Sequence, residues 1–244
     1  MSTEALTLDR FLDGRVVAAQ PASGFRAGHD TVLLAAAVPA TSGSVIIELG
    51  SGAGVASLCL AARIPGARIT GIEIDADLVR LANENAARNA VADRVSFITA
   101  DAAQPSTHAD GVDHVFFNPP FHPDTGQVSP VPARDRATRD SGNAIREWTG
   151  RALSLVRDGG TVTAIVRADR VEDIQDAARP YGGLIFPLLP RAGSKPKRAI
   201  VHIVKVEGEA FSTVAGLILH EADGRSTEAA ENVLRHAKPL NLVP

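Results

Sequence analysis

The stretch Val45-Ile-Ile-Glu-Leu-Gly-Ser-Gly-Ala-Gly54 decides the fold class of this chain. Three apolar residues lead into an acidic one, and every second residue of the last five is glycine. The next segment, residues 55–63, carries apolar residues at helical spacing. This order predicts a strand, a tight turn and a helix of a parallel α/β sheet, with the helix amides pointing at a ligand. A glycine turn that only packs the helix on the strand is the alternative, since the third glycine of the dinucleotide fingerprint is missing.

Length and composition favour one folded α/β domain. The chain has 244 residues, of which 45% are hydrophobic and 22% are charged, and these are ordinary values for a globular domain. We therefore expect a single domain over residues 1–244, in which residues 1–40 form a hairpin and helix extension packed on the core. The formal net charge of −3 means that a nucleic-acid partner must be met by a local basic patch.

Cysteine usage and the N-terminal residues indicate where the protein works. The only cysteine, Cys59, lies among apolar residues at helical spacing, so no intramolecular disulfide can form. The first residues lack a basic segment followed by an apolar one, and no apolar run is long enough to cross a membrane. We expect a cytoplasmic protein.

The segment before the quoted stretch predicts a small extension. Turns at residues 12–15 and 21–24 frame a β-hairpin within residues 8–27. Asp30 is predicted to cap a short helix that runs from Thr31 to Val38 and stops at Pro39. The polar run that leads into this helix is unusual for a plain linker, and we name Gly28 and Asp30 in it as candidate substrate contacts.

Two acidic residues follow predicted strands further along the chain. Glu73 ends the strand 67–73, close to where a βαβ unit places a ribose-binding carboxylate, and a carboxylate can accept from both hydroxyls of a ribose. Asp75 is predicted to cap the helix 76–89. Asp101 follows the strand 94–99, where an acid can accept from the amino group of an adenine or can simply be a turn residue. The glycine loop and these acids favour a nucleoside-containing cofactor.

The predicted strand 112–117 runs into Asn118-Pro-Pro-Phe121. The prolines end the strand, so that Asn118 and the carbonyl of Pro119 face the mouth of the sheet beside the glycine loop. The amino nitrogen of adenine, guanine or an amide attacks poorly because its lone pair is delocalised. Two oxygens that accept its N–H groups orient it and stabilise the developing positive charge, and Phe121 offers a face for a planar base. We predict that Asn118, Pro119, Pro120 and Phe121 carry the reaction without a metal.

Positive charge gathers between the last two long strands predicted, 183–189 and 198–205. The segment 190–198 has four basic residues and no acid, which makes it a candidate phosphate contact or else a solvated hairpin tip. The candidate substrate-binding residues here are Arg191, Lys195, Lys197 and Arg198. The long polar loop 122–142 is a second candidate for a binding loop.

Taken together, the quoted glycine stretch, Glu73, Asp101 and the Asn-Pro-Pro-Phe motif resemble the class I S-adenosylmethionine (SAM)-dependent N-methyltransferases. That resemblance implies a Rossmann-like, seven-stranded and mostly parallel sheet of order 3-2-1-4-5-7-6, whose seventh strand is antiparallel. It also implies that SAM is the cofactor. The residues that would hold it are Glu48, Gly50, Ser51, Gly52, Gly54, Glu73, Asp101 and Asn118.

Residues 24–35 and 219–225 narrow the resemblance to the bacterial tRNA(Val) (adenine-N6)-methyltransferases. The resemblance covers nearly the whole chain and implies a tRNA substrate, methylated at adenine N6. Because the motif with Phe121 also resembles guanine-N2 ribosomal RNA methyltransferases, guanine N2, a protein glutamine amide and a small molecule stay open as acceptors. A non-catalytic SAM-binding module is the alternative from another class, and Asn118-Pro-Pro-Phe121 argues against it.

Overall fold

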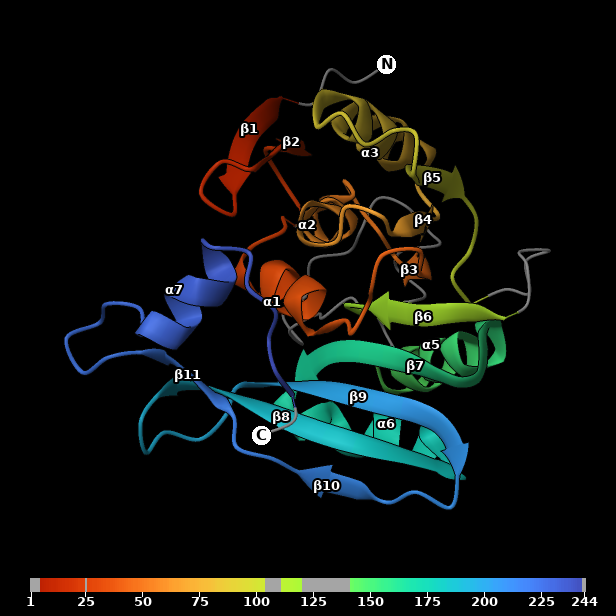
Figure 1. Cartoon of the computed structure of the whole chain (residues 1–244), viewed down its shortest axis with the longest axis vertical. Helices are drawn as coiled ribbons and strands as arrows, with labels where there is room; N and C mark the ends of the chain where they lie inside the picture. The colour runs from red at the N-terminus through yellow and green to blue at the C-terminus, as the bar shows by residue number, and fades with distance from the viewer. Residues whose placement is uncertain (1–4, 25, 104–110, 120–140, 243–244) are drawn as a thin grey trace.

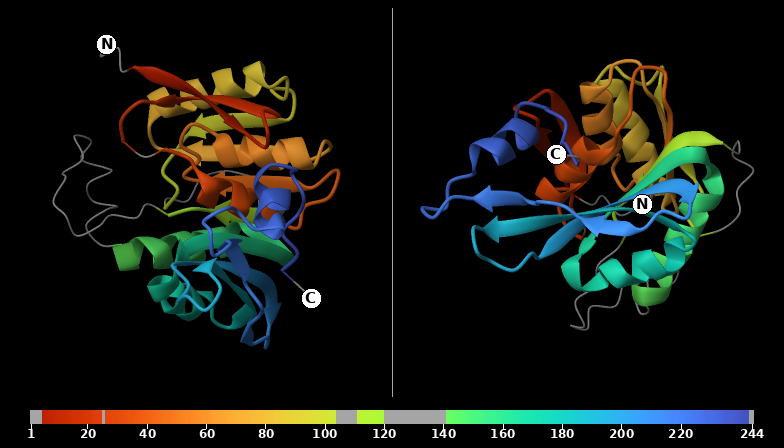
Figure 2. Two further views of the ribbon diagram at one scale, coloured as in Figure 1. Left: turned by 90° about the vertical axis from the view of Figure 1, so that its left-hand side faces the viewer. Right: turned by 60° about the horizontal axis from the view of Figure 1, so that its bottom comes forward.

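A mostly parallel sheet runs through the middle of the molecule, with helices on both of its faces (Figures 1 and 2). The computed structural model describes residues 5–24, 26–103, 111–119 and 141–242, without the side chains of 141–143. The strands of this sheet are β3 (Val45–Leu49), β4 (Arg68–Glu73), β5 (Val95–Thr99), β6 (Val112–Phe117), β7 (Val156–Arg167), β8 (Tyr181–Arg191), β9 (Arg198–Glu207), β10 (Phe211–Thr213) and β11 (Leu217–His220).

The strand order confirms the expected topology and corrects the number of strands. Seven strands follow the order β5-β4-β3-β6-β7-β9-β8, which is the expected 3-2-1-4-5-7-6, and β9 is antiparallel to both of its neighbours. Within the described residues the sheet has nine strands rather than seven, because β10 and β11 pair with β8 one after the other on its outer edge. The eleven residues of β8 offer room for both short strands, which cover an edge that would otherwise be unpaired.

Helices cover the two faces of the sheet and enclose two apolar cores. One face carries α1 (His29–Ala37), α2 (Val55–Arg63), α3 (Ala76–Arg88) and α7 (Glu228–Leu234), and the other carries α5 (Ser141–Leu155) and α6 (Val171–Ala178), which follows the short 3₁₀ turn η1 (Ala168–Arg170). Because side chains alternate along a strand, Phe116 packs in the first core and Phe117 in the second. Among the described residues, no helix is both long and apolar enough to span a bilayer.

The predicted N-terminal hairpin is confirmed as β1 (Leu6–Phe11) paired antiparallel with β2 (Val16–Pro21). Two asparagines hold it against the sheet domain, one in α3 and one at the C-cap of that helix. Asn85 and Asn89 each bond both the N–H and the C=O of a β2 residue, Ala19 and Val17 respectively. An asparagine amide carries one donor and one acceptor side, so it can replace a neighbouring strand at these positions.

Of the two predicted helix caps, one is confirmed and one is wrong. The carboxylate of Asp75 accepts from the N–H groups of Asp77 and Leu78 at the start of α3. Helix α1 begins at His29 instead of Thr31, so its N-cap is Gly28 and Asp30 lies inside the first turn. From there the Asp30 carboxylate accepts a hydrogen bond from Arg198 Nε at 2.9 Å, and this ion pair fixes the start of α1 to β9.

Candidate active site at the carboxyl edge of the sheet

Parallel strands bring the predicted site residues to one edge of the sheet. The strands β3, β4, β5, β6 and β7 all run in the same direction. The glycine loop follows β3, Glu73 ends β4, Asp101 follows β5 and Asn118 follows β6. Their common position at the carboxyl ends is where α/β sheets bind ligands.

The glycine loop turns sharply between β3 and α2. Gly50 and Gly52 have φ angles of 68° and 53°, which disfavour any residue with a Cβ atom. The N–H groups of Gly50 and Ser51 both donate to the carbonyl of Ile72 in β4, at 2.8 and 3.0 Å. No atom lies within 4 Å of the place where a Cβ of Gly52 would be. The loop therefore leaves open space over Gly52, as a close approach by a ligand requires.

Glu73 connects the second strand to this loop. Its Oε2 atom accepts from the N–H of Gly52 at 2.9 Å, and its Oε1 atom accepts from the N–H of Asp75 at 3.1 Å. Each carboxylate oxygen can accept a second hydrogen bond. Glu73 can therefore hold the loop and still accept from two hydroxyl groups of a ribose.

Glu48 is buried beneath the loop. One of its carboxylate oxygens accepts from both the N–H and the hydroxyl of Ser57 in α2. Burial raises the pKa of Glu48 to about 8, because desolvation and the nearby charge of Glu73 outweigh the two hydrogen bonds from Ser57. A cationic group of a ligand next to this carboxyl would favour its ionised form.

Two buried polar atoms at this edge have no hydrogen-bond partner among the described residues: Ser51 Oγ and Asn118 Oδ1. A buried polar atom without a partner costs free energy, so such atoms at a ligand site indicate where a ligand supplies the missing group. Asp101 already has one local partner, since its Oδ1 atom accepts from the N–H of Ala103 at 2.9 Å. Pro119 is buried, whereas Pro120, Phe121 and nearly all of the loop 122–142 lie outside the described residues.

The residues described fit SAM. The open space over Gly52 and the remaining acceptor capacity of Glu73 suit a ribose. The buried carboxyl of Glu48 and the free hydroxyl of Ser51 suit the charged methionine end.

Trp148 of α5 is a site residue that the sequence motifs did not indicate. Its ring lies against Gly50, and it makes an edge contact with Phe117, whose ring centroid is 5.9 Å away at an interplanar angle of 75°. The only sequence signal is that it is the chain's single tryptophan and follows the Asn118 motif. The side chain links the glycine loop to the residue before Asn118.

Asn85 of α3 is a second residue that the motifs missed. It is completely buried, and its Nδ2 atom donates to the carbonyl of Ala53 in the glycine loop at 3.0 Å as well as to Ala19 in the hairpin. An asparagine at an apolar position of a helix pattern is the signal that could have revealed it. Asn85 therefore ties the N-terminal hairpin and the glycine loop to one helix.

The other substrate candidates lie along the same edge, further from Asn118. Gly28 caps α1, and Asp30 is paired with Arg198. Arg191, Lys195 and Lys197 are exposed on the turn between β8 and β9.

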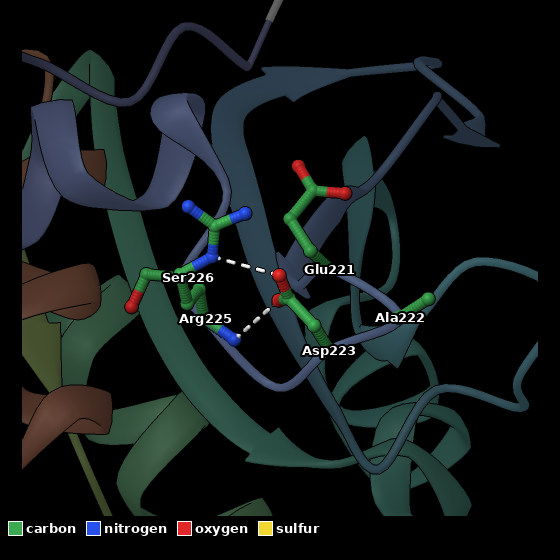
Figure 3. Close-up of a pocket in the computed structure, with 5 residues that line it drawn as sticks. All are labelled: Glu221, Ala222, Asp223, Arg225 and Ser226. Atoms are coloured by element: carbon green, nitrogen blue, oxygen red, sulfur yellow. Dashed lines mark hydrogen bonds and ion pairs between the residues drawn. The ribbon is translucent and has the colours of Figure 1, made fainter.

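No group of three or more His, Cys, Asp or Glu side chains that could bind a metal occurs within the described residues. An open hollow further along this edge is lined by Glu221, Ala222, Asp223, Arg225 and Ser226 (Figure 3).

Comparisons with known proteins agree with this geometry. Residues 25–139 match the methyltransferase small domain family. The tRNA1(Val) (adenine(37)-N6)-methyltransferase of Phocaeicola vulgatus is 31% identical over 179 residues, which cover 72% of this chain and 75% of that protein. The release factor glutamine methyltransferase of Chlorobaculum tepidum is 34% identical over 178 residues, 68% of this chain and 60% of that protein.

The fold has a close counterpart among solved structures. A crystal structure from Agrobacterium tumefaciens, described as that of a predicted O-methyltransferase, superposes with a TM-score of 0.72 at 24% identity. The match covers 87% of this chain and 98% of that one. The chain is therefore a class I SAM-dependent methyltransferase, and it belongs to the family that includes the tRNA1(Val) (adenine(37)-N6)-methyltransferase of Phocaeicola vulgatus.

Proposed function

We propose that the enzyme methylates an exocyclic amino group of a nucleobase in RNA, and that adenine N6 of a tRNA is the acceptor. The observation that carries this proposal is the buried Oδ1 atom of Asn118, which has no hydrogen-bond partner among the described residues. Asn118 directly follows β6, at the edge of the sheet where the glycine loop and Glu73 also lie. An acceptor placed there, next to a cofactor site, suits a substrate that brings an N–H donor.

Asn118 acts on the nitrogen that receives the methyl group. Its Oδ1 atom accepts one N–H of the amine, and the carbonyl of Pro119 accepts the other. These bonds hold the lone pair toward the cofactor and strengthen as positive charge develops on the nitrogen. Once the N–C bond has formed, one of the two N–H protons leaves to solvent and the product is a neutral secondary amine.

The residues around the cofactor site position the cofactor next to Asn118 in the proposed methyl transfer. When bound, SAM would supply an electrophilic methyl group on a sulfonium, and S-adenosylhomocysteine would be the leaving group of the transfer. Glu73 accepts from the N–H of Gly52 and would also accept from the ribose. Trp148 packs on Gly50 and Phe117, and in this way it connects the glycine loop to the residue before Asn118. We assign Asp101 to the adenine of the cofactor.

An amide nitrogen of a protein glutamine is the second candidate acceptor, because it also has two N–H groups and a delocalised lone pair. The similarity to a release factor glutamine methyltransferase favours it. That similarity covers 60% of the relative, whereas the similarity to the tRNA enzyme covers 75%. The larger share of the relative that is covered supports RNA as the acceptor.

Methyl-labelled SAM incubated with total bacterial tRNA, ribosomal RNA and protein separates these candidates. We expect label in the tRNA fraction, and nucleoside mass spectrometry of the digested RNA should find it as N6-methyladenosine. Label in N2-methylguanosine would move the acceptor to guanine. Label that stays with protein would replace the proposed function by glutamine methylation, and an Asn118→Ala variant serves as the blank in each arm.

A further inference from the structure

The turn between β8 and β9 presents three cations that the fold itself does not use. Arg191, Lys195 and Lys197 are exposed, and no ion pair joins any of them to another residue in the described part of the chain. The turn is held by its own hydrogen bonds: Ser194 Oγ donates to the carbonyl of Arg191 at 2.6 Å and accepts from its N–H at 3.0 Å. The cations therefore project from an ordered turn.

Strand direction puts this turn at the edge where Asn118 lies. β9 is antiparallel to both β7 and β8, so β8 runs parallel to β7 and β6 and ends at the same edge. Figure 1 shows β6, β7, β9 and β8 side by side in this order. The register places Ile185 of β8 at the level of Phe117, so β8 continues for six residues beyond the end of β6. With neighbouring strands about 4.8 Å apart and a rise of about 3.3 Å per residue, the ends of β6 and β8 are separated by roughly 25 Å. A few nucleotides of an RNA strand span that distance.

Neighbouring acids leave most of this charge uncompensated. The Asp30 carboxylate is already engaged with Arg198, and Asp169 with Arg167. In the adjacent turn Asp223 pairs with Arg225 Nε at 2.7 Å, as Figure 3 shows, and the N–H and guanidinium of Arg225 lower the pKa of Asp223. Among the described acids of that turn, Glu221 has no such ion pair, so one acid of this kind accompanies three cations on the β8–β9 turn.

We propose that Arg191, Lys195 and Lys197 form a phosphate-contact surface for the RNA strand that flanks the methylated base, a few nucleotides from it. This proposal rests on the proposed function, because it takes Asn118 as the point where the base is held. It gives a net acidic protein, of formal charge −3, a local means to bind a polyanion. Phosphate contacts place the strand without reading its sequence, so the base is selected at the Asn118 site.

The test compares two triple variants of equal net charge. The first is Arg191→Gln, Lys195→Gln, Lys197→Gln. The control is Arg68→Gln, Arg179→Gln, Lys238→Gln, which removes three exposed cations away from the carboxyl edge. Binding of bulk tRNA is measured over a range of salt concentrations. For the first variant the log–log salt slope should fall by about two to three units, and affinity should drop by at least about tenfold at low salt. The control variant should keep the wild-type slope.

Two further measurements separate this proposal from the proposed function. S-adenosylhomocysteine should bind both variants like the wild type, which shows that the cofactor site is intact. Methylation of full-length tRNA should fall in the first variant, while a short oligonucleotide that cannot reach the turn should be methylated at the wild-type rate. If the first variant keeps the wild-type salt slope while the wild-type enzyme methylates tRNA, the phosphate-contact surface is wrong and the proposed function stands. If the wild-type enzyme methylates no RNA, the proposed function is wrong, and the salt slope of tRNA binding still tests the phosphate-contact surface.

Discussion

The indole ring of Trp148 lies directly against the main chain of Gly50. A Cβ atom at position 50 would stand 2.5 Å from Cη2 of the ring, which is closer than carbon atoms can approach without movement. The same ring contacts Phe117, the last residue before Asn118. One side chain of α5 thus touches both the glycine loop and the strand that leads into Asn118, the residue for which we propose amine binding.

Because of this contact, substitution by alanine should destabilise the fold more at Gly50 than at Gly52. Gly50→Ala should lower the free energy of unfolding in two ways. The positive φ should cost about 1–2 kcal/mol, and displacement of Trp148 should cost about 1–3 kcal/mol more. Gly52→Ala has only the positive-φ cost, because nothing lies within 4 Å of its Cβ position. Urea unfolding of the two variants without ligand measures the difference. Equal losses would mean that the ring moves aside freely. Gly52→Ala should instead weaken S-adenosylhomocysteine binding, since its methyl group enters the open space.

Removal of the Glu73 carboxylate should weaken cofactor binding strongly. Glu73→Ala loses the partner of the Gly52 N–H and the acceptors that we propose for the ribose. Hydrogen bonds to a charged group contribute about 1.5–3 kcal/mol each, so calorimetry should show a loss of roughly tenfold or more in S-adenosylhomocysteine affinity. Glu84→Ala on the exposed face of α3 is the control and should bind normally. A Glu73→Ala variant with wild-type affinity would exclude the ribose role.

The buried carboxyl of Glu48 should make stability depend on pH. Its pKa is about 8 in the folded chain against an ordinary value of 4.5, so the folded state holds the proton more tightly. The resulting stabilisation is complete below about pH 4.5 and is lost as pH rises toward 8, over which the unfolding free energy should fall by a few kcal/mol. Glu48→Gln cannot titrate and should lack this decline.

A second buried group titrates with the opposite sign and must be separated from Glu48. Burial lowers the pKa of His202 to about 4, so its contribution to stability is lost as pH falls below its ordinary value of 6.5. Urea unfolding at several pH values between about 5 and 8 should therefore be read as the difference between wild type and Glu48→Gln, in which the His202 contribution cancels. A pH-independent difference would show that Glu48 is ionised in the fold.

Loss of Asn118 should affect turnover more than cofactor binding. Asn118→Ala removes an acceptor whose hydrogen bond strengthens with the charge on the amine, and removal of one such preorganised group lowers rates by about a hundred- to a thousandfold. Asn118→Asp keeps an acceptor and should retain part of the activity. Single-turnover methylation of the acceptor found by labelling measures both. Wild-type rates for Asn118→Ala would remove the amine-binding role.

The sequence by itself was enough to predict features that depend on neighbouring residues. The glycine loop between β3 and α2, the cap at Asp75 and the β1–β2 hairpin were all predicted from local pattern, because φ angles, capping and turn geometry involve residues close together in the chain. The order of the seven main strands came from the resemblance of the motifs. The strand β10 was missed, because three residues are too few for a periodic pattern.

Tertiary structure alone decided which distant groups meet. It placed Trp148 on Gly50, Asn85 between Ala19 and Ala53, and Arg198 on Asp30, which the local pattern had suggested as a helix cap. Such contacts join residues far apart in the chain, so their existence depends on how helices pack on the sheet and on which strands are neighbours. The three cations of the β8–β9 turn illustrate the same point. The sequence showed that they are basic, and only the direction of β8 put them on the edge that carries Asn118.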